Sequence, residues 1–175
     1  MTSKLKVNLI NDSGDNNIIT SDGSGVITSS KFKIGQVLSS ETTSSTSTTS
    51  SSFSDTGITL AITPSSTSSK IYVTIQLAFM LYGGGTSLNA TGRLKLVSTV
   101  GGSSTDLFTT SQNPTFEDFD ENQDSFVLNY PINYLHTSNT TSEVTYKLQF
   151  ACTAGSFTAQ VYSNRSSITL MEVLP

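Results

Sequence analysis

The single histidine of the chain, His136, is the only imidazole that a Ser-His-Asp triad could use as its base. It is the first residue of the polar turn expected at 136–142. No Gly-x-Ser-x-Gly segment, the setting of a serine nucleophile, precedes a helical pattern. With Cys152, His136 supplies only two of the four ligands of a structural zinc site. The glycine run 83–85 lacks the Lys-Ser/Thr ending of a phosphate loop. We therefore predict a protein that is not an enzyme, with no catalytic residue, cofactor or metal, and interpret His136 as a solvated turn residue.

Acidic side chains gather in one segment, and they invite two chemical hypotheses. Asp118, Asp120 and Asn122 have the alternate spacing of a calcium loop, but Gln123 replaces the required glycine and Asn129 the bidentate glutamate. A calcium site of another kind and a paired-carboxylate glycosidase both stay open. The default interpretation is a solvated acidic loop. Its polar residues are Glu117, Asp118, Asp120, Glu121, Asn122 and Asp124.

Composition excludes several classes of partner. The net charge of −4 and the pI near 4.7 disfavour nucleic-acid binding, which needs a basic field. No apolar run reaches the length of a spanning helix, so we expect no membrane insertion. Residues 1–10 lack the apolar block of a secretory signal, which leads us to expect synthesis in a cytoplasm. One cysteine permits no internal disulfide, and Cys152 is predicted to be a core residue.

The segment Lys70–Tyr82 organises the predicted fold. Every second residue from Ile71 to Leu81 is apolar, so one face of a long strand is wholly apolar. Its length predicts a position in the middle of a sheet. The segment Glu143–Thr153 shows the same alternation. We expect both strands to line one sandwich core.

The remaining segments indicate an all-β protein. Short strands recur between turns without any helical period, which predicts a jelly-roll-like antiparallel β-sandwich of about eight strands. Pro131 lies inside one of them, 125–135, and marks it as an edge strand or a bulged one. The segment Ser39–Ser52 is Ser and Thr except for Glu41. It is either a flexible loop or an exposed edge strand.

Residues 1–35 are predicted to form an extended N-terminal arm, and residues 36–175 the sandwich knob. The arm contains short alternating stretches that are too small to bury a core of their own. They need something to pair with, which is the main domain, a symmetry mate or another protein. If it is another protein, the candidate attachment residues are Leu5, Val7, Leu9, Ile18 and Ile19.

The last strand carries apolar residues on both faces, with Ile168 and Leu170 on one and Met171 and Val173 on the other. A strand that is apolar on both faces is usually buried on both, and one sandwich core covers only one of them. These four residues are therefore the candidate subunit interface. The pattern alone predicts a protein that is not a monomer.

Two stretches of the chain resemble a module of phage virion proteins. The hairpin Thr56–Val73, with its Ile-Thr-Pro-Ser-Ser-Thr-Ser-Ser-Lys-Ile core, is similar to one in marine and cyanobacterial phage fibre or capsid decoration proteins. The tail Val161–Val173 resembles the closing strands of that module, and Lys4–Gly14 the start of fibre-like proteins. The resemblance implies a homotrimeric β-sandwich on the virion surface.

Three functions follow from these patterns. The first is a capsid decoration, or cement, protein whose arm binds the major capsid protein or another virion protein; the arm is short and no heptads or repeats form a shaft. The second is a tail fibre or fibre tip that binds host-surface glycans. The third is a glycan-depolymerising enzyme that uses the acidic loop.

Overall fold

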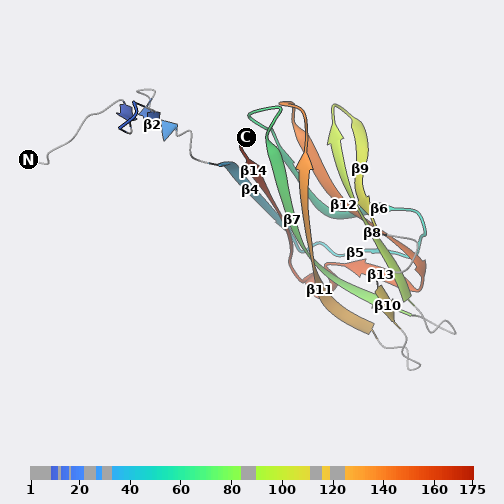
Figure 1. Cartoon of the computed structure of the whole chain (residues 1–175). Helices are drawn as coiled ribbons and strands as arrows, with labels where there is room; N and C mark the ends of the chain where they lie inside the picture. Colours follow the sequence, from blue (N-terminus) through green and yellow to red (C-terminus); the bar gives the residue numbers. More distant parts are fainter. Residues whose placement is uncertain are drawn as a thin grey trace, which may run out of the picture.

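The alternating segment Lys70–Tyr82 is strand β7 in the computed structural model, and it lies inside a sheet as predicted (Figure 1). Strand β11 (Ser125–Thr137) pairs with β7 along its whole length. The other side of β7 therefore pairs with β14 (Ser166–Val173) and, farther along, β13 (Ser156–Ala159). We call this layer the β7 sheet. Its outermost strands beyond these two are β4 (Ile34–Thr42), which pairs with β14, and β5 (Thr46–Thr48), which pairs with β13.

The second layer, which we call the β12 sheet, is built around the other predicted core strand, β12 (Val144–Ala154). β12 lies between β6 (Ser54–Ile62) and β8 (Ala90–Val100). Two short strands pair with the far side of β8. They are β9 (Ser103–Thr109) and β10 (Phe116–Asp118).

The structure describes residues 9–11, 13–15, 17–21, 27–28, 33–83, 90–110, 116–118 and 125–175. Among them, the two sheets pack face to face through their alternating apolar residues, as the sequence predicts for an antiparallel sandwich. Leu77 and Leu148 are fully buried, and so is Cys152, which confirms its place in the core. Three rings, Phe79, Phe150 and Phe157, make edge-to-face contacts at 5.2–5.3 Å between centroids.

The two large sheets contain eleven strands, whereas the sequence indicates about eight. Two of the additional strands, β4 and β5, lie in or overlap the Ser/Thr-rich segment. Residues 39–42 and 46–48 are thus strand, and residues 43–45 and 49–52 connect them as loop. The third, β10, includes Glu117 and Asp118, which were interpreted as part of an acidic loop. Pro131 lies in an edge strand, as predicted, and β11 continues through it without a register shift.

Strands β1 (Leu9–Asn11), β2 (Asn17–Ser21) and β3 (Ile27–Thr28) form a separate three-stranded sheet. Among the described residues, these strands pair only with one another, and Figure 1 draws them apart from the two layers. Ile34 and Gly35 belong to β4, so the sandwich begins two residues before the predicted boundary at residue 36.

Candidate interaction surface

The outer face of the β7 sheet carries a row of four apolar side chains. Because the odd-numbered residues of β7 face the core, Tyr72 faces outward. The pairing register places Met171 beside Tyr72 on one side and Leu135 on the other, and Val37 beside Met171. The exposed fractions are 51% for Val37, 36% for Tyr72 and 51% for Leu135, and Met171 is half-buried between its neighbours. We call these four residues the apolar row.

A second row runs beside it and consists of short uncharged polar side chains. Ser39, Thr169, Thr74 and Asn133 stand opposite one another on the same four strands. The hydroxyls of Ser39 and Thr169 lie 3.1 Å apart, and Thr74 Oγ1 donates to Asn133 Oδ1 at 2.8 Å. These four residues, the hydroxyl row, thus satisfy much of their hydrogen bonding within the sheet. Such a face loses little when water is removed from it.

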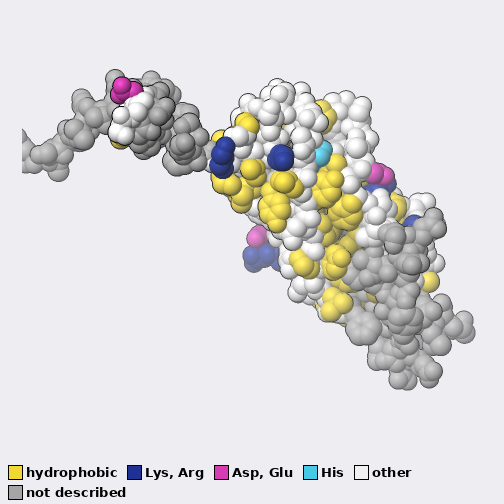
Figure 2. All heavy atoms as spheres, viewed as in Figure 1, with side chains coloured by type: hydrophobic (Ala, Val, Ile, Leu, Met, Phe, Trp, Pro, Cys, Tyr) yellow, Lys and Arg dark blue, Asp and Glu magenta, His cyan; other side chains and the backbone are white. Residues whose placement is uncertain are grey.

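Charged side chains lie only at the margins of the described part of this face. Lys70 stands at one end of β7, and the exposed ion pair between Arg165 and Glu41, at 3.2 Å, lies toward the other end of the sheet. Figure 2 views this face and shows hydrophobic side chains gathered over β4, β14, β7 and β11. An uncharged, partly apolar sheet face of this kind is typical of a surface that another protein covers.

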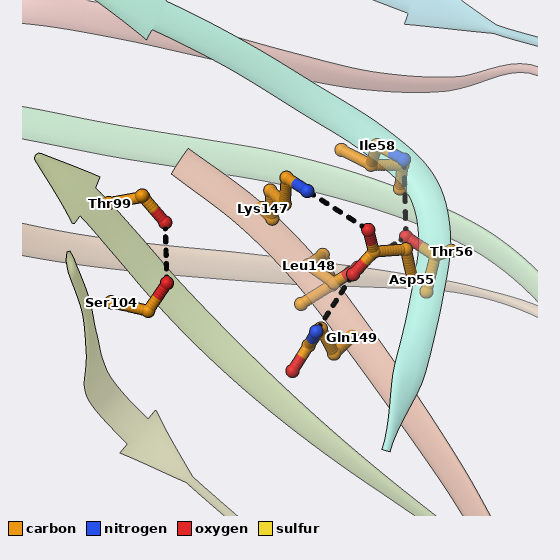
Figure 3. Close-up of polar contacts among 8 residues, drawn as sticks. All are labelled: Asp55, Thr56, Ile58, Thr99, Ser104, Lys147, Leu148 and Gln149. Carbon is orange, nitrogen blue, oxygen red and sulfur yellow. Dashed lines mark hydrogen bonds and ion pairs between the residues drawn. The ribbon is translucent and has the colours of Figure 1, made fainter. Parts of the chain in front are cut away.

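The outer face of the β12 sheet has the opposite character. Asp55 accepts hydrogen bonds from Gln149 at 2.8 Å and Lys147 at 3.1 Å (Figure 3). The hydrogen bond from Gln149, opposed by partial burial and helped by the Lys147 ammonium, lowers the pKa of Asp55. Thr99 and Ser104 join their hydroxyls at 2.9 Å on the neighbouring strands. These contacts are those of a face that remains in water.

Two further cations lie on that face around one aromatic ring. Arg93 Cζ and Lys95 Nζ lie 5.1 and 4.7 Å from the centroid of Phe53. Lys95 also pairs with Asp106 at 3.3 Å. Exposed pairs of this kind contribute little to stability, about 0–1 kcal/mol each. Their significance is the contrast: one outer face of the sandwich is charged and the other is not.

The four candidate interface residues of the last strand divide between the two faces of β14. Ile168 and Leu170 are 1% and 0% exposed and lie in the core of the chain's own sandwich. Met171 and Val173 lie on the outer face and are partly exposed. A partner could therefore reach Met171 and Val173, while Ile168 and Leu170 are covered already. The interface itself stays a prediction.

The candidate attachment residues lie in or near the small N-terminal sheet. Leu9 is in β1, and Ile18 and Ile19 are in β2, where Ile19 stands opposite Ile10. Leu5 and Val7 lie outside the described residues. Attachment through the arm likewise stays a prediction.

His136 was wrongly interpreted as a solvated turn residue. It lies in β11, on the face that carries Ile132 and Tyr134, and it is half-buried. Its Nδ1 lies 2.8 Å from the hydroxyl of Tyr146, whose side chain is buried. Burial lowers the pKa of His136 and raises the pKa of Tyr146. The pair gives a core hydroxyl its partner, and continuing the alternation of the strand past Leu135 would have placed His136 inward.

The described residues contain no arrangement of side chains that supports the other two chemical hypotheses, the calcium site and the glycosidase. Those residues contain no group of three metal-ligating side chains, and the residues from Asp120 to Asp124 lie outside them. The calcium and glycosidase hypotheses thus depend on residues that lie, except for Glu117 and Asp118 of β10, outside the described part of the chain. No helix in the described part of the chain is long and apolar enough to cross a bilayer.

A shallow cavity of about 300 Å³ opens at the edge of β11 that faces away from β7. Phe108 of β9 contributes one wall, and its ring lies 6.1 Å from that of Tyr134. The remaining walls come from β11 itself. We call this cavity the edge notch; it is lined by Phe108, Tyr130, Pro131, Ile132, Asn133 and Tyr134.

No protein-family model and no curated protein matches the chain. Solved structures of infectious bursal disease virus particles are similar to it at low level. The VP2 subviral particle gives a TM-score of 0.40 with 10% identity over 80% of this chain, and the T=1 particle gives 0.37 with 9% identity over 87%. The chain spans 38% and 39% of those two proteins, less than half of each. Because both TM-scores are below 0.5, these similarities do not indicate a function.

Proposed function

We propose that this protein is a non-enzymatic structural component of a bacteriophage virion. In this proposal it forms a homotrimeric knob on the particle surface, and its N-terminal arm anchors it there as a capsid decoration protein. The observation that carries the proposal is the uncharged outer face of the β7 sheet, with its apolar and hydroxyl rows. The resemblance of the hairpin Thr56–Val73 to a module of phage virion proteins supports a place on a virion.

Identical copies of this chain are the partner that suits the uncharged face. Residues near a symmetry axis meet their own copies, so a charge there is repelled by an identical charge, whereas an uncharged face avoids this repulsion. Tyr72 and Met171 are of the residue types that are enriched at the centres of protein interfaces. The pattern supports closed symmetry, and the resemblance to phage proteins makes that symmetry threefold.

Decoration of the capsid is favoured over a long fibre by the absence of shaft-forming elements, helical or repetitive, among the described residues. A fibre tip that binds host glycans is the second candidate, since the edge notch has the aromatic lining on which sugar rings stack.

Light scattering at micromolar concentration tests the assembly. The expected mass is three times the 18.6 kDa of one chain. Met171→Asp places a charge in the apolar row and should give monomers, while Thr99→Asp, on the charged outer face of the β12 sheet, should leave the trimer intact. A wild-type protein that remains at 18.6 kDa would refute the proposal.

Counting copies per virion by gel densitometry separates the two candidates. Hundreds of copies indicate decoration of the capsid, and a few to a few dozen indicate a fibre. Incubation with host polysaccharide checks the third possibility, because only an enzyme would shorten the polymer.

A further inference from the structure

Among the described residues, neither lateral edge of the β7 sheet pairs with a further strand. β11 has 13 residues, pairs within that part of the chain only with β7, and contains no lysine, arginine, aspartate or glutamate. Edge strands of soluble proteins are normally blunted by charge, proline, bulges or a covering element, and of these the described part of the chain gives β11 only Pro131. The opposite edge, β4, exposes Ile34, Val37 and Leu38. Each edge has the character of a strand that is covered in the assembled state.

The proposed trimer supplies a neighbour for each edge. If three β7 sheets turn their uncharged faces toward a threefold axis, then the side edges of adjacent sheets meet, β11 of one copy against β4 of the next. Within one chain, β4 and β11 are antiparallel, because each of the three successive pairings between them is antiparallel. Rotation about an axis along the strands preserves that sense, so the two edges meet in an orientation that permits a ladder.

The side chains at the two edges are complementary. The apolar row ends at Leu135 on β11 and at Val37 on β4, so joining the edges continues the row from copy to copy. In the same register, Leu38 stands opposite Tyr134. Both residues lie on the core side of their strands, and Leu38 is 37% exposed at its edge. Leu38 would thus lie over the edge notch, whose aromatic and aliphatic lining suits an apolar side chain.

We propose that β11 of each copy pairs with β4 of the next, with Leu135 opposite Val37 and Leu38 in the edge notch. The three β7 sheets then form one closed ring around the threefold axis, and no free edge is left in that layer at these positions. This inference rests on the proposed trimer and adds the strands and the register by which it closes. The ligand of the notch is therefore a second copy of this chain.

Engineered cysteines test the register. Ser39 and Asn133 are both exposed on the outer face, and the proposed pairing sets them opposite each other. Opposed residues in an antiparallel ladder lie about 4.5–5.5 Å apart at Cα, within the range of a disulfide. Ser39→Cys with Asn133→Cys should give covalent trimers on non-reducing gels after oxidation. Cys152 is buried and does not compete.

The controls separate the outcomes. Neither Ser39→Cys nor Asn133→Cys alone should form cross-links, because the contact joins unlike edges. Linked dimers of either single variant would overturn the proposed pairing of β11 with β4. So would a double variant that is trimeric by light scattering yet forms no linked species. A monomeric wild-type protein would instead overturn the trimer on which that pairing depends.

Truncation of Leu38 tests the notch independently. Leu38→Ala should raise the dissociation constant of the trimer at least tenfold, because the side chain would lose its contacts with the neighbouring copy. Tyr162→Ala is the matched control: Tyr162 is 76% exposed, lies on neither edge, and should leave the constant unchanged. Circular dichroism establishes that both variants fold. A folded Leu38→Ala protein with the wild-type dissociation constant would contradict the placement of Leu38.

Discussion

Glu172 is a buried carboxylate at the point where the chain enters the sandwich, and its replacement by glutamine should destabilise the fold. Its side chain faces the core side of β14 and is 1% exposed. Oε1 accepts from the Ser65 amide at 2.6 Å and from the Ser65 hydroxyl at 2.7 Å. Oε2 accepts from Gln36 Nε2 at 3.0 Å. One side chain thus holds β14, β4 and the turn after β6 together.

The size of the effect follows from the donors that surround the carboxylate. A glutamine at residue 172 keeps one acceptor oxygen and presents an NH2 group to the other donor. If it faces Gln36, two NH2 groups meet, and Gln36 cannot turn its amide without losing its bond to the Thr63 carbonyl at 2.7 Å. One charge-assisted hydrogen bond is worth about 1.5–3 kcal/mol. Since the Ser65 bonds also lose their charged acceptor, we expect Glu172→Gln to cost about 3 kcal/mol.

The same contacts predict the dependence on pH. Burial alone would raise the pKa of Glu172, but the hydrogen bonds from Ser65 and Gln36 outweigh it, and the pKa lies below the ordinary value of 4.5. A depressed carboxyl pKa stabilises the fold fully above the unfolded value and loses that effect as the pH falls through the folded value. The difference between wild type and Glu172→Gln should therefore be constant from neutral pH to about 5, and shrink below 4.5.

Urea unfolding at pH 7 and pH 4, followed by circular dichroism at one protein concentration, measures both effects. Glu41→Gln is the control, since Glu41 is an exposed carboxylate in the adjacent strand and should change stability by less than about 1 kcal/mol. Equal stability of Glu172→Gln and wild type at pH 7, or a difference that does not shrink in acid, would refute the role assigned to this carboxylate.

Three further predictions concern the core, the arm and the half-buried His136. Leu77→Ala or Leu148→Ala should lower the free energy of unfolding by about 2–5 kcal/mol, and near-neutral melting of both would contradict their burial. Deletion of residues 1–32 should leave a folded trimeric sandwich that no longer binds particles in a sedimentation assay; a truncated protein that unfolds would show that the arm belongs to the core. Since burial lowers the pKa of His136, its protonation opposes folding, so stability should fall as the pH drops below 6.5 and His136→Asn should remove that slope in urea titrations.

The strands that sequence predicts well are those with strong contrast between alternate residues. In Lys70–Tyr82 and Val144–Ala154, apolar residues at every second position determine which face is buried, and the structure confirms both. The Ser/Thr-rich segment lacks such contrast. Its incorporation as β4 depends on pairing with β14 and on contacts such as that between Ser39 and Thr169, which are long-range.

The candidate surface was predictable only in part. Met171 and Val173 stand out because the last strand is apolar on both faces, and the structure places both on the outer face. The other members of the apolar row, Val37, Tyr72 and Leu135, come from three distant segments. Only the register of the sheet sets them side by side, and a single sequence does not specify that register. The edge notch depends on the same information.

The contrast between the two outer faces also bears on how relatives of this chain would diverge. Substitutions on the outer face of the β12 sheet exchange one hydrated side chain for another. Positions such as Lys147 and Asp106 should therefore vary among charged and amide residues in related sequences. On the β7 sheet a change at Thr169 or Asn133 would need matching changes across the row. Sequence families should therefore show a variable face and a slowly evolving one, and the slow face should avoid acquiring charge.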